Sequence, residues 1–283
     1  MKKSILFLSC LALLSVGCAK VDHEEVTPEK GKRHLTLRAT VDEPGTRLSV
    51  SNSGKFSWQQ DDEIVYLTES DGSYNDPKSA QTYSDAPTGD FEIELDEDET
   101  VRYAMYPLSE FSKFSTSANA HVFGLDDNYV YKLGSTYMPM LGSNFTIDDD
   151  NMMKASFRAV GGVLKLTVKN FPVDEEYIEK LRLSVPYKKI TGAFPIQEDS
   201  EGVKYIETVD NTSETNHIDF FFRGGYYEKT MTFYFPLPCG TYNNLKFTLF
   251  DGDGDHIFSK TAQIDGGLIV HRNEIITAPT LNL

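Results

Sequence analysis

The stretch Leu35-Thr36-Leu37-Arg38-Ala39-Thr40-Val41 alternates apolar and polar side chains with a period of two. Because successive side chains of a β-strand point to opposite faces of a sheet, this period predicts a strand with one buried face. Turn-forming clusters of Gly, Asn, Asp and Pro separate the runs that follow. Further alternating runs are centred on Ile93, Tyr103, Leu166, Leu183, Phe233 and Phe247. Strands follow strands, so the sequence predicts an all-β chain.

The order of these runs also predicts the domain organisation. Strand-helix-strand units are disfavoured because helical periodicity is almost absent, which favours antiparallel β-sandwiches. A polar stretch at Asp148-Asp149-Asp150-Asn151 precedes a new series of strands. Each side of it is close to the size of one seven-stranded sandwich of about 100 residues. We therefore expect two sandwich domains in tandem, over residues 34–150 and 151–283.

The N-terminus has the three parts of a secretion signal. Lys2 and Lys3 supply positive charge, residues 5–14 are apolar, and the small residues Ser15-Val16-Gly17 precede Cys18. A Cys directly after small residues resembles a bacterial lipobox, in which the chain is cut before the Cys and its thiol is acylated. The usual box has Leu where Ser15 stands. The alternative is a soluble secreted protein in which Cys18 is incidental.

The lipobox resemblance implies a signal peptide over residues 1–17 and a flexible polar tether over residues 18–33, acylated at Cys18. Two acyl chains give stable anchoring where one would be marginal. Acidic residues soon after the Cys resemble signals that send some lipoproteins of Bacteroidota-type bacteria to the outer face of the outer membrane. The expected location is the outer membrane, lipid-anchored and exposed at the cell surface.

The composition argues against nucleic acid as a partner and against a membrane-spanning helix as the anchor. Lys and Arg total 27 against 43 Asp and Glu, for a formal charge of −16, and such a surface repels phosphate backbones. Nucleic acid is therefore not expected as a partner. The longest uncharged apolar run, Ile5–Val16, is shorter than the roughly 20 residues that a membrane-spanning helix needs.

The cysteines and catalytic motifs give no support for an enzyme. Cys10 leaves with the signal and Cys18 is acylated, so Cys239 has no partner for an intrachain disulfide. Cys239 lies between Pro238 and Gly240 and is interpreted as an inert residue near a turn. The sequence contains neither a nucleophile elbow nor a phosphate-binding Gly-rich loop before a helix. We expect no catalytic residues and no cofactor.

A metal site is also not expected. Asp251-Gly252-Asp253-Gly254-Asp255 suggests a calcium loop, but the EF-hand pattern requires Gly and Glu where His256 and Ala262 stand. A hairpin turn explains the Asp-Gly run better, with incidental calcium affinity left open. The histidines lack the spacing of zinc ligands.

The aromatic residues have two interpretations. Phe220-Phe221-Phe222, Tyr226-Tyr227 and Phe233-Tyr234-Phe235 could form a stacking platform for sugars or peptides. Burial in a sandwich is the simpler account, because the aromatics lie on strand-like segments beside Gly224-Gly225. Trp58 is expected in the core of the first domain.

Four segments resemble the fimbrillin family of surface lipoproteins, and they occur in the family's order. They are Thr46-Arg47 with Gly54–Trp58 and Asp61–Val65, then Phe157–Val168, then Phe235–Phe247, and finally His271–Ile276. This sequence departs from the family pattern at Cys239, where Ala is usual, and at Asp62, where Gly is common and a turn is expected to differ.

The resemblance implies two transthyretin-like β-sandwich domains and a role as pilus subunit, anchor or tip, with other fimbrial subunits or further copies as partners. In the family's pilins an arginine-directed cut frees the first strand, and the groove then accepts a strand from a neighbouring subunit. Arg47 is the matching candidate site and Arg38 the second. An unprocessed member is the alternative. Other functions left open are a surface-anchored module that binds a host glycan or peptide and, last, a secreted enzyme.

Overall fold

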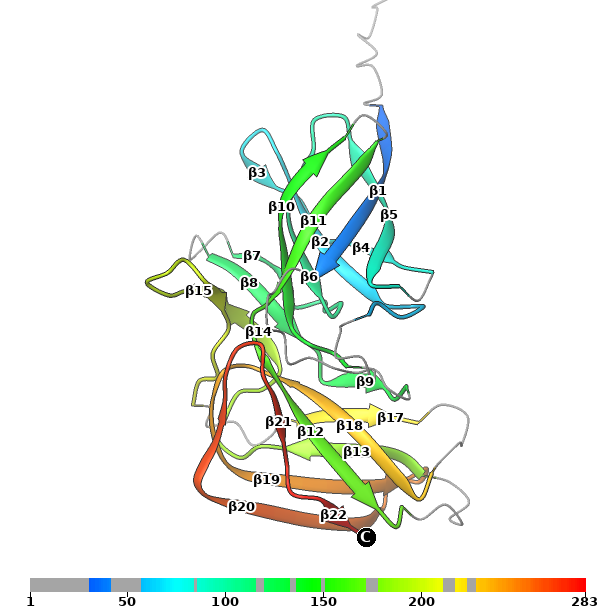
Figure 1. Ribbon diagram of the computed structural model, residues 1–283, viewed down its shortest axis with the longest axis vertical. Coiled ribbons are helices and arrows are strands. Elements are labelled where there is room, and N and C mark those ends of the chain that lie inside the picture. Colours follow the sequence, from blue (N-terminus) through cyan, green and yellow to red (C-terminus); the bar gives the residue numbers. More distant parts are fainter. Residues whose placement is uncertain are drawn as a thin grey trace, which may run out of the picture. The chain divides into compact units, whose positions relative to one another are not determined.

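The computed structural model describes residues 31–41, 57–83, 86–115, 120–132, 136–148, 151–171, 178–210, 217–222 and 228–283. These residues form strands, turns and loops without a helix (Figure 1). Within the same ranges, nothing meets the length and apolarity of a helix that crosses a membrane. The all-β prediction is confirmed.

An eight-stranded sheet contains most of the strands up to residue 159 (Figure 1). Its order is β3-β2-β6-β10-β11-β1-β5, and β4 pairs with β2. The strands are β1 (Lys32–Val41), β2 (Glu63–Ser70), β3 (Ser73–Tyr74), β4 (Lys78–Gln81), β5 (Thr88–Asp96), β6 (Thr100–Tyr106), β10 (Met140–Ile147) and β11 (Met152–Ala159). After β4, Thr82 bridges Phe91 of β5 at the other end of the sheet. The sheet therefore curls around one core.

Alternating apolar residues of these strands form that core. It includes Leu35, Leu37, Ala39, Trp58, Ile64, Phe91, Ile93, Leu95, Ala104, Met140, Met153 and Phe157. The residues of β1, β5 and β11 enter it at every second position, as the period-two pattern predicts.

Two sheets share a second core in the C-terminal part. One sheet contains β18 (Thr230–Leu237), β12 (Gly162–Lys169), β21 (Ile275–Thr277) and β22 (Leu281–Asn282). The other runs β20 (His256–Val270), β19 (Gly240–Asp251), β13 (Ile178–Ser184), β17 (His217–Phe221) and β9 (Asn128–Val130). Their apolar faces meet through Leu164, Leu166, Leu181, Leu183, Phe220, Phe233, Phe235, Tyr242 and Phe247.

The N-terminal part contributes strands to sheets that also contain strands of the C-terminal part. β9 pairs with β17, and β8 (Ala120–Leu125) pairs with β14 (Gly192–Pro195) and with β7 (Lys113–Ser115). β15 (Gln197–Glu198) and β16 (Lys204–Tyr205) form a short hairpin. Strands from residues 113–130 thus complete sheets whose other members follow residue 160.

The change of sheet lies ten residues beyond the sequence boundary at residue 150. β11 falls on the C-terminal side of that boundary but pairs with β10 and β1 of the eight-stranded sheet. The new sheet starts with β12, after Val160 and Gly161. Asp148, which lies in the segment before β11, instead binds that strand, since its N–H donates to Met152 O at 3.0 Å.

The prediction of purely antiparallel sheets is wrong at several pairs. β1 runs parallel to β11, β9 to β17, and both β21 and β22 to β12. Each parallel pair joins strands far apart in the sequence. Alternation shows which side of a strand is buried, but it carries no information about the direction of a distant partner.

A third apolar cluster covers the outer face of β2, β6 and β10. Val65, Leu67, Met105 and Leu141 of that face pack against Phe123, Leu125, Phe194 and Ile206. This cover explains why Ile64–Leu67 in β2 are buried on both faces and read as a continuous apolar run.

Candidate functional site

The N-terminal strand β1 is the first candidate site, because it is an internal strand of its sheet. It pairs antiparallel with β5 from Lys32 to Thr40 and parallel with β11 from Thr36 to Val41. Leu35, Leu37 and Ala39 are at most 4% exposed, and all face the core. Removing β1 would therefore leave two unpaired backbone edges and an apolar groove between β5 and β11.

The other face of β1 carries basic side chains opposite a row of acids on β5. The cross-strand contacts are Lys32 Nζ to Glu94 Oε1 at 2.5 Å, His34 Nε2 to Glu94 Oε2 at 3.8 Å, Thr36 Oγ1 to Glu92 Oε1 at 3.1 Å, and a bidentate pair from Arg38 to Asp90 at 2.7 and 2.8 Å. If β1 slipped by one residue along β5, all of these charged side chains of β1 would point into the core. The groove therefore specifies both the register of the strand that fills it and the charge of that strand's outer face.

Trp58 closes the groove from the residues that follow Arg47. Its indole Nε1 donates to Ala39 O at 3.2 Å, and the side chain is fully buried. Its ring makes edge contacts with Phe91 and Phe157 at 5.1 and 5.3 Å between centroids. The predicted core position of Trp58 is confirmed. Gly89 of β5 leaves room for it, since a Cβ there would lie 2.8 Å from the indole Cγ.

Glu99 ties the start of β1 to the rest of the sheet. Its backbone carbonyl accepts from Arg33 Nη2 at 2.5 Å, and its carboxylate is 3% exposed. The carboxylate accepts from Thr68 Oγ1 at 3.0 Å, Asn75 Nδ2 at 2.8 Å, Lys78 Nζ at 2.6 Å and Asp96 N at 2.9 Å. Burial by itself would raise the pKa of Glu99, but these hydrogen bonds outweigh it and lower the pKa.

The structure locates one of the two candidate cleavage residues. Arg38 lies in the middle of β1, with its side chain paired to Asp90 and neighbouring strands on both sides. A protease needs an accessible extended segment, which an internal strand does not offer. Cys18 and Arg47 both lie outside the described residues.

Asp62 helps to form a turn with Gln59. Its carboxylate Oδ2 accepts from Gln59 N at 2.8 Å, and its N–H donates to Gln59 O at 3.0 Å. Its Oδ1 accepts from Tyr106 Oη at 3.1 Å. The side chain therefore fixes the Gln59–Asp62 turn against β6.

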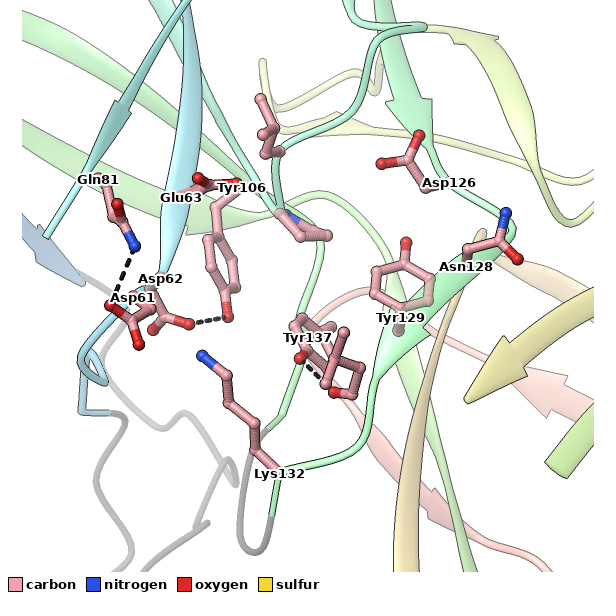
Figure 2. Close-up of a pocket in the computed structure, with 13 residues that line it drawn as sticks. Asp61, Asp62, Glu63, Gln81, Tyr106, Asp126, Asn128, Tyr129, Lys132 and Tyr137 are labelled. Carbon is pink, nitrogen blue, oxygen red and sulfur yellow. Dashed lines mark hydrogen bonds between the residues drawn. The ribbon is translucent and has the colours of Figure 1, made fainter. Parts of the chain in front are cut away.

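A polar cavity of about 460 Å³ opens beside this turn (Figure 2). Four carboxylates line it together with Lys132, whose Nζ donates to Gln60 O at 3.2 Å. The other polar residues that line it include Gln81, Asn128, Tyr106, Tyr129 and Tyr137. Figure 2 shows Asp61, Asp62 and Gln81 on one side, Asp126 and Asn128 on the other, and Lys132 reaching between them.

Asp126 has a perturbed carboxyl group in this cavity. Burial raises its pKa to about 6, Ser109 opposes the rise by donating to Oδ1 at 2.9 Å, and the charges of Glu110 and Asp127 add to it. The carboxylate is therefore partly protonated in mildly acidic solution. Burial also raises the pKa of Tyr129 well above its ordinary value, so its phenol stays neutral.

Two further sequence predictions concern the reactivity of Cys239 and the possible calcium loop at residues 251–255. Cys239 lies between β18 and β19, and burial raises the pKa of its thiol to about 11, as expected for an inert residue. The predicted hairpin at residues 251–255 is confirmed, since β19 and β20 pair across it. Asp251 Oδ1 is engaged within this turn, accepting from the N–H groups of Asp253 and Asp255 at 3.1 and 2.8 Å.

In the part of the aromatic run that the structure describes, the most buried side chains belong to the core and do not form a stacking platform for a ligand. Phe220, Phe233 and Phe235 are at most 2% exposed and contact one another, whereas Phe221 and Phe222 are half-buried. Tyr226 and Tyr227 lie outside the described residues.

Sequence reasoning missed both the charged ladder on β1 and the cavities. The ladder had a signal, because Asp90, Glu92, Glu94 and Asp96 are acidic at every second position of one strand. The polar cavity had none, because its residues come from separate turns and strands that meet only in the fold.

No family model matches the chain, and no curated protein is significantly similar to it in sequence. Solved structures are similar at low identity. A candidate cell adhesion protein from Bacteroides uniformis is 14% identical, with a TM-score of 0.44, over 88% of this chain and 93% of that one. The fimbrial anchor protein Mfa2 from Porphyromonas gingivalis is 11% identical, with a TM-score of 0.31, over 81% and 82%. The tip fimbrial protein Mfa3 from the same organism is 11% identical, with a TM-score of 0.32, over 83% and 82%.

Proposed function

We propose that this chain is a lipid-anchored surface lipoprotein that serves as a structural or accessory component of fimbriae, built from two transthyretin-like sandwich domains. The observation that carries the proposal is the position of β1. It is an internal strand that inserts a complete apolar stripe between β5 and β11, and the Arg47 segment follows it directly. The ordered family-like segments of the sequence supply the fimbrial context.

Strand exchange is the assembly step that this arrangement supports. A cut after Arg47 would break the covalent link between β1 and the rest of the sheet, so that β1 could leave the groove. An incoming strand would restore the backbone pairs on both sides and the buried side chains together. The ladder on β5 adds a requirement, because the replacement strand must present basic or neutral side chains at the positions of Lys32, His34 and Arg38.

Mass spectrometry of the protein isolated from the cell surface tests processing. A mature N-terminus at Leu48 is expected for a subunit that exchanges strands. An intact acylated N-terminus at Cys18 in every molecule would contradict the subunit role and leave a role as fimbrial anchor.

A Cys18→Ala variant tests the lipid attachment. It is expected to leave the membrane fraction and to lose incorporation of labelled palmitate. Retention of both properties would show that Cys18 is not the attachment site.

Peptide exchange tests the groove directly. A recognition sequence for a site-specific protease, inserted after Arg47 in the full chain, allows a single cut under native conditions. A labelled peptide with the sequence of Lys32–Val41 should then replace β1 and stay bound. The control peptide carries Leu35→Asp and Leu37→Asp, which keep the basic face but remove the apolar one. Equal binding of the two peptides would contradict the groove.

A surface-anchored binding module that does not polymerise is the second candidate function. The polar cavity of Figure 2 favours it, because carboxylates, amides and tyrosines around about 460 Å³ are a lining suited to a small polar ligand. Electron microscopy of the processed protein separates the two functions. Filaments require self-association, whereas a binding module remains as single particles.

A further inference from the structure

A second cavity, of about 560 Å³, lies over the outer face of the eight-stranded sheet. Leu141 of β10 and Arg158 of β11 stand opposite each other and both line it. Tyr103 of β6 and Ser143 of β10 line it as well, and the Tyr103 ring lies against His121 with 4.0 Å between centroids. The floor is thus a rigid sheet surface, apolar at Leu141 and Val160 and polar at its edge.

Two fixed segments form the walls. The first is Gly202–Lys204. Within this segment, Asp199 Oδ1 accepts from Val203 N at 2.9 Å, and just after it Ile206 N donates to Val160 O at 2.7 Å, which holds the segment over the sheet. In the second, Asn273 N donates to Gly161 O at 2.8 Å. Hydrogen bonds therefore attach both walls to the sheet, and the cavity is formed before any ligand arrives.

The charged side chains that the structure describes in the lining of this cavity are all basic. Arg158, Lys204 and Arg272 line it, and none of its described lining residues is acidic. Arg272 Nη1 donates to Ala159 O at 3.0 Å, which fixes the guanidinium in place, and Lys204 is paired with Glu198. The contrast with the rest of the molecule is large, because the whole chain has a charge of −16 and the cavity of Figure 2 has four carboxylates.

We propose that this cavity binds an acidic sugar residue through its carboxylate. Guanidinium groups bind carboxylates with two parallel hydrogen bonds, which favours Arg158 and Arg272 for the acid. Ser143, Asn144 and Asn273 offer donors and acceptors to ring hydroxyls. The apolar side chains of the floor face the C–H groups of a ring.

The hydroxyl-binding side chains favour a sugar over an acidic peptide, since a peptide carboxylate has no neighbouring ring hydroxyls for them to bind. The volume falls within the range of about 300–1,000 Å³ typical of small-ligand sites. Among the residues that the structure describes, those lining this cavity lie outside β1. The inference therefore stands whether or not the chain exchanges strands.

Titration of the purified full chain with glucuronic acid, followed by ligand-observed NMR and calorimetry, tests the proposal. Glucuronic acid is expected to bind, and glucose, which has the same ring without the carboxylate, is expected not to bind. Acetate and inorganic phosphate are expected to bind at least tenfold more weakly than glucuronic acid. Raising the salt concentration should weaken binding because the attraction is partly electrostatic.

Two variants assign the binding to this cavity. Arg158→Gln and Arg272→Gln should each weaken glucuronic acid binding about tenfold or more, the usual size of a lost charge-assisted hydrogen bond. Arg102→Gln is the matched control, because Arg102 is exposed, pairs with Glu69 and is not among the described residues that line the cavity. Since Arg158 is exposed, its variant should keep the unfolding transition of the wild type. Equal binding of glucose, equal or stronger binding of acetate, phosphate or an acidic dipeptide, or unchanged affinity in Arg158→Gln would overturn the proposal.

Discussion

The indole Nε1 of Trp58 donates a hydrogen bond of 3.2 Å to the backbone carbonyl of Ala39. This contact joins β1 to a residue that lies on the far side of the candidate cleavage segment. If β1 left after a cut at Arg47, Trp58 would stay in the groove and its indole N–H would lose the Ala39 carbonyl. A replacement strand gains a hydrogen bond if it presents a carbonyl at the position of Ala39.

Trp58→Phe should lower the free energy of unfolding by about 2 kcal/mol, because it removes this hydrogen bond and leaves a small void beside Phe91 and Phe157. Urea denaturation measures the loss, and hydrogen exchange should show faster opening at β1 than at β19. The control is Tyr83→Phe, at a residue that is 70% exposed. A Trp58→Phe chain as stable as the wild type would contradict the role of the indole.

Reversing one charge of the ladder should destabilise the sheet. Arg38→Glu places two acids opposite each other on β1 and β5 and should lower the urea midpoint of unfolding by a small but measurable amount, since both side chains are partly exposed. The double variant Arg38→Glu with Asp90→Arg should recover most of that loss. A double-mutant cycle in urea gives the coupling energy, and a coupling of zero would mean that the pair does not help to set the register.

Glu99→Gln should cost about 3 kcal/mol, because the buried side chain loses its charge while Lys78 and three further donors remain around it. Thermal unfolding and urea denaturation at neutral pH check this value. Because the pKa of Glu99 is lowered in the folded state, its contribution is present above the pKa of the unfolded carboxyl and is lost as the pH falls through the folded value. The matched control, Glu92→Gln on the exposed face of β5, should change stability little.

Asp126→Asn should stabilise the protein increasingly as the pH rises from 5 to 7. The pKa of Asp126 is raised to about 6 in the folded state from an ordinary value of 3.8, so the folded chain binds its proton more tightly than the unfolded chain. Ionisation therefore costs stability between these two values, and the Asn variant avoids it while keeping an oxygen for Ser109. The Tm difference between variant and wild type, measured across this range, should grow with pH. A constant difference would show that Asp126 has an ordinary pKa.

The positions and buried faces of the strands were predictable, because side-chain alternation depends on local geometry. Leu35, Leu37 and Ala39 enter the core as their spacing indicates, and Trp58 lies beside them. The pairing of β9 with β17 was not predictable, because Asn128–Val130 is too short for a periodic pattern and its partner begins at His217. The cationic cavity is hidden for the same reason. Arg158, Lys204 and Arg272 are more than 40 residues apart in the sequence, and only the packing of β16 and the segment after β20 against the sheet brings them together.

The pairing of β8 and β9 with strands of the C-terminal part has a consequence for biogenesis. A chain that leaves the ribosome or an export channel with its N-terminus first presents Ala120–Leu125 and Asn128–Val130 long before Gly192–Pro195 and His217–Phe221 emerge. These early strands lack their partners until the later ones have been synthesised, and pairing over such separations is then slow. The N-terminal part therefore cannot mature as an independent module during synthesis. A nascent chain stalled before residue 192 should need chaperone protection that the complete chain does not.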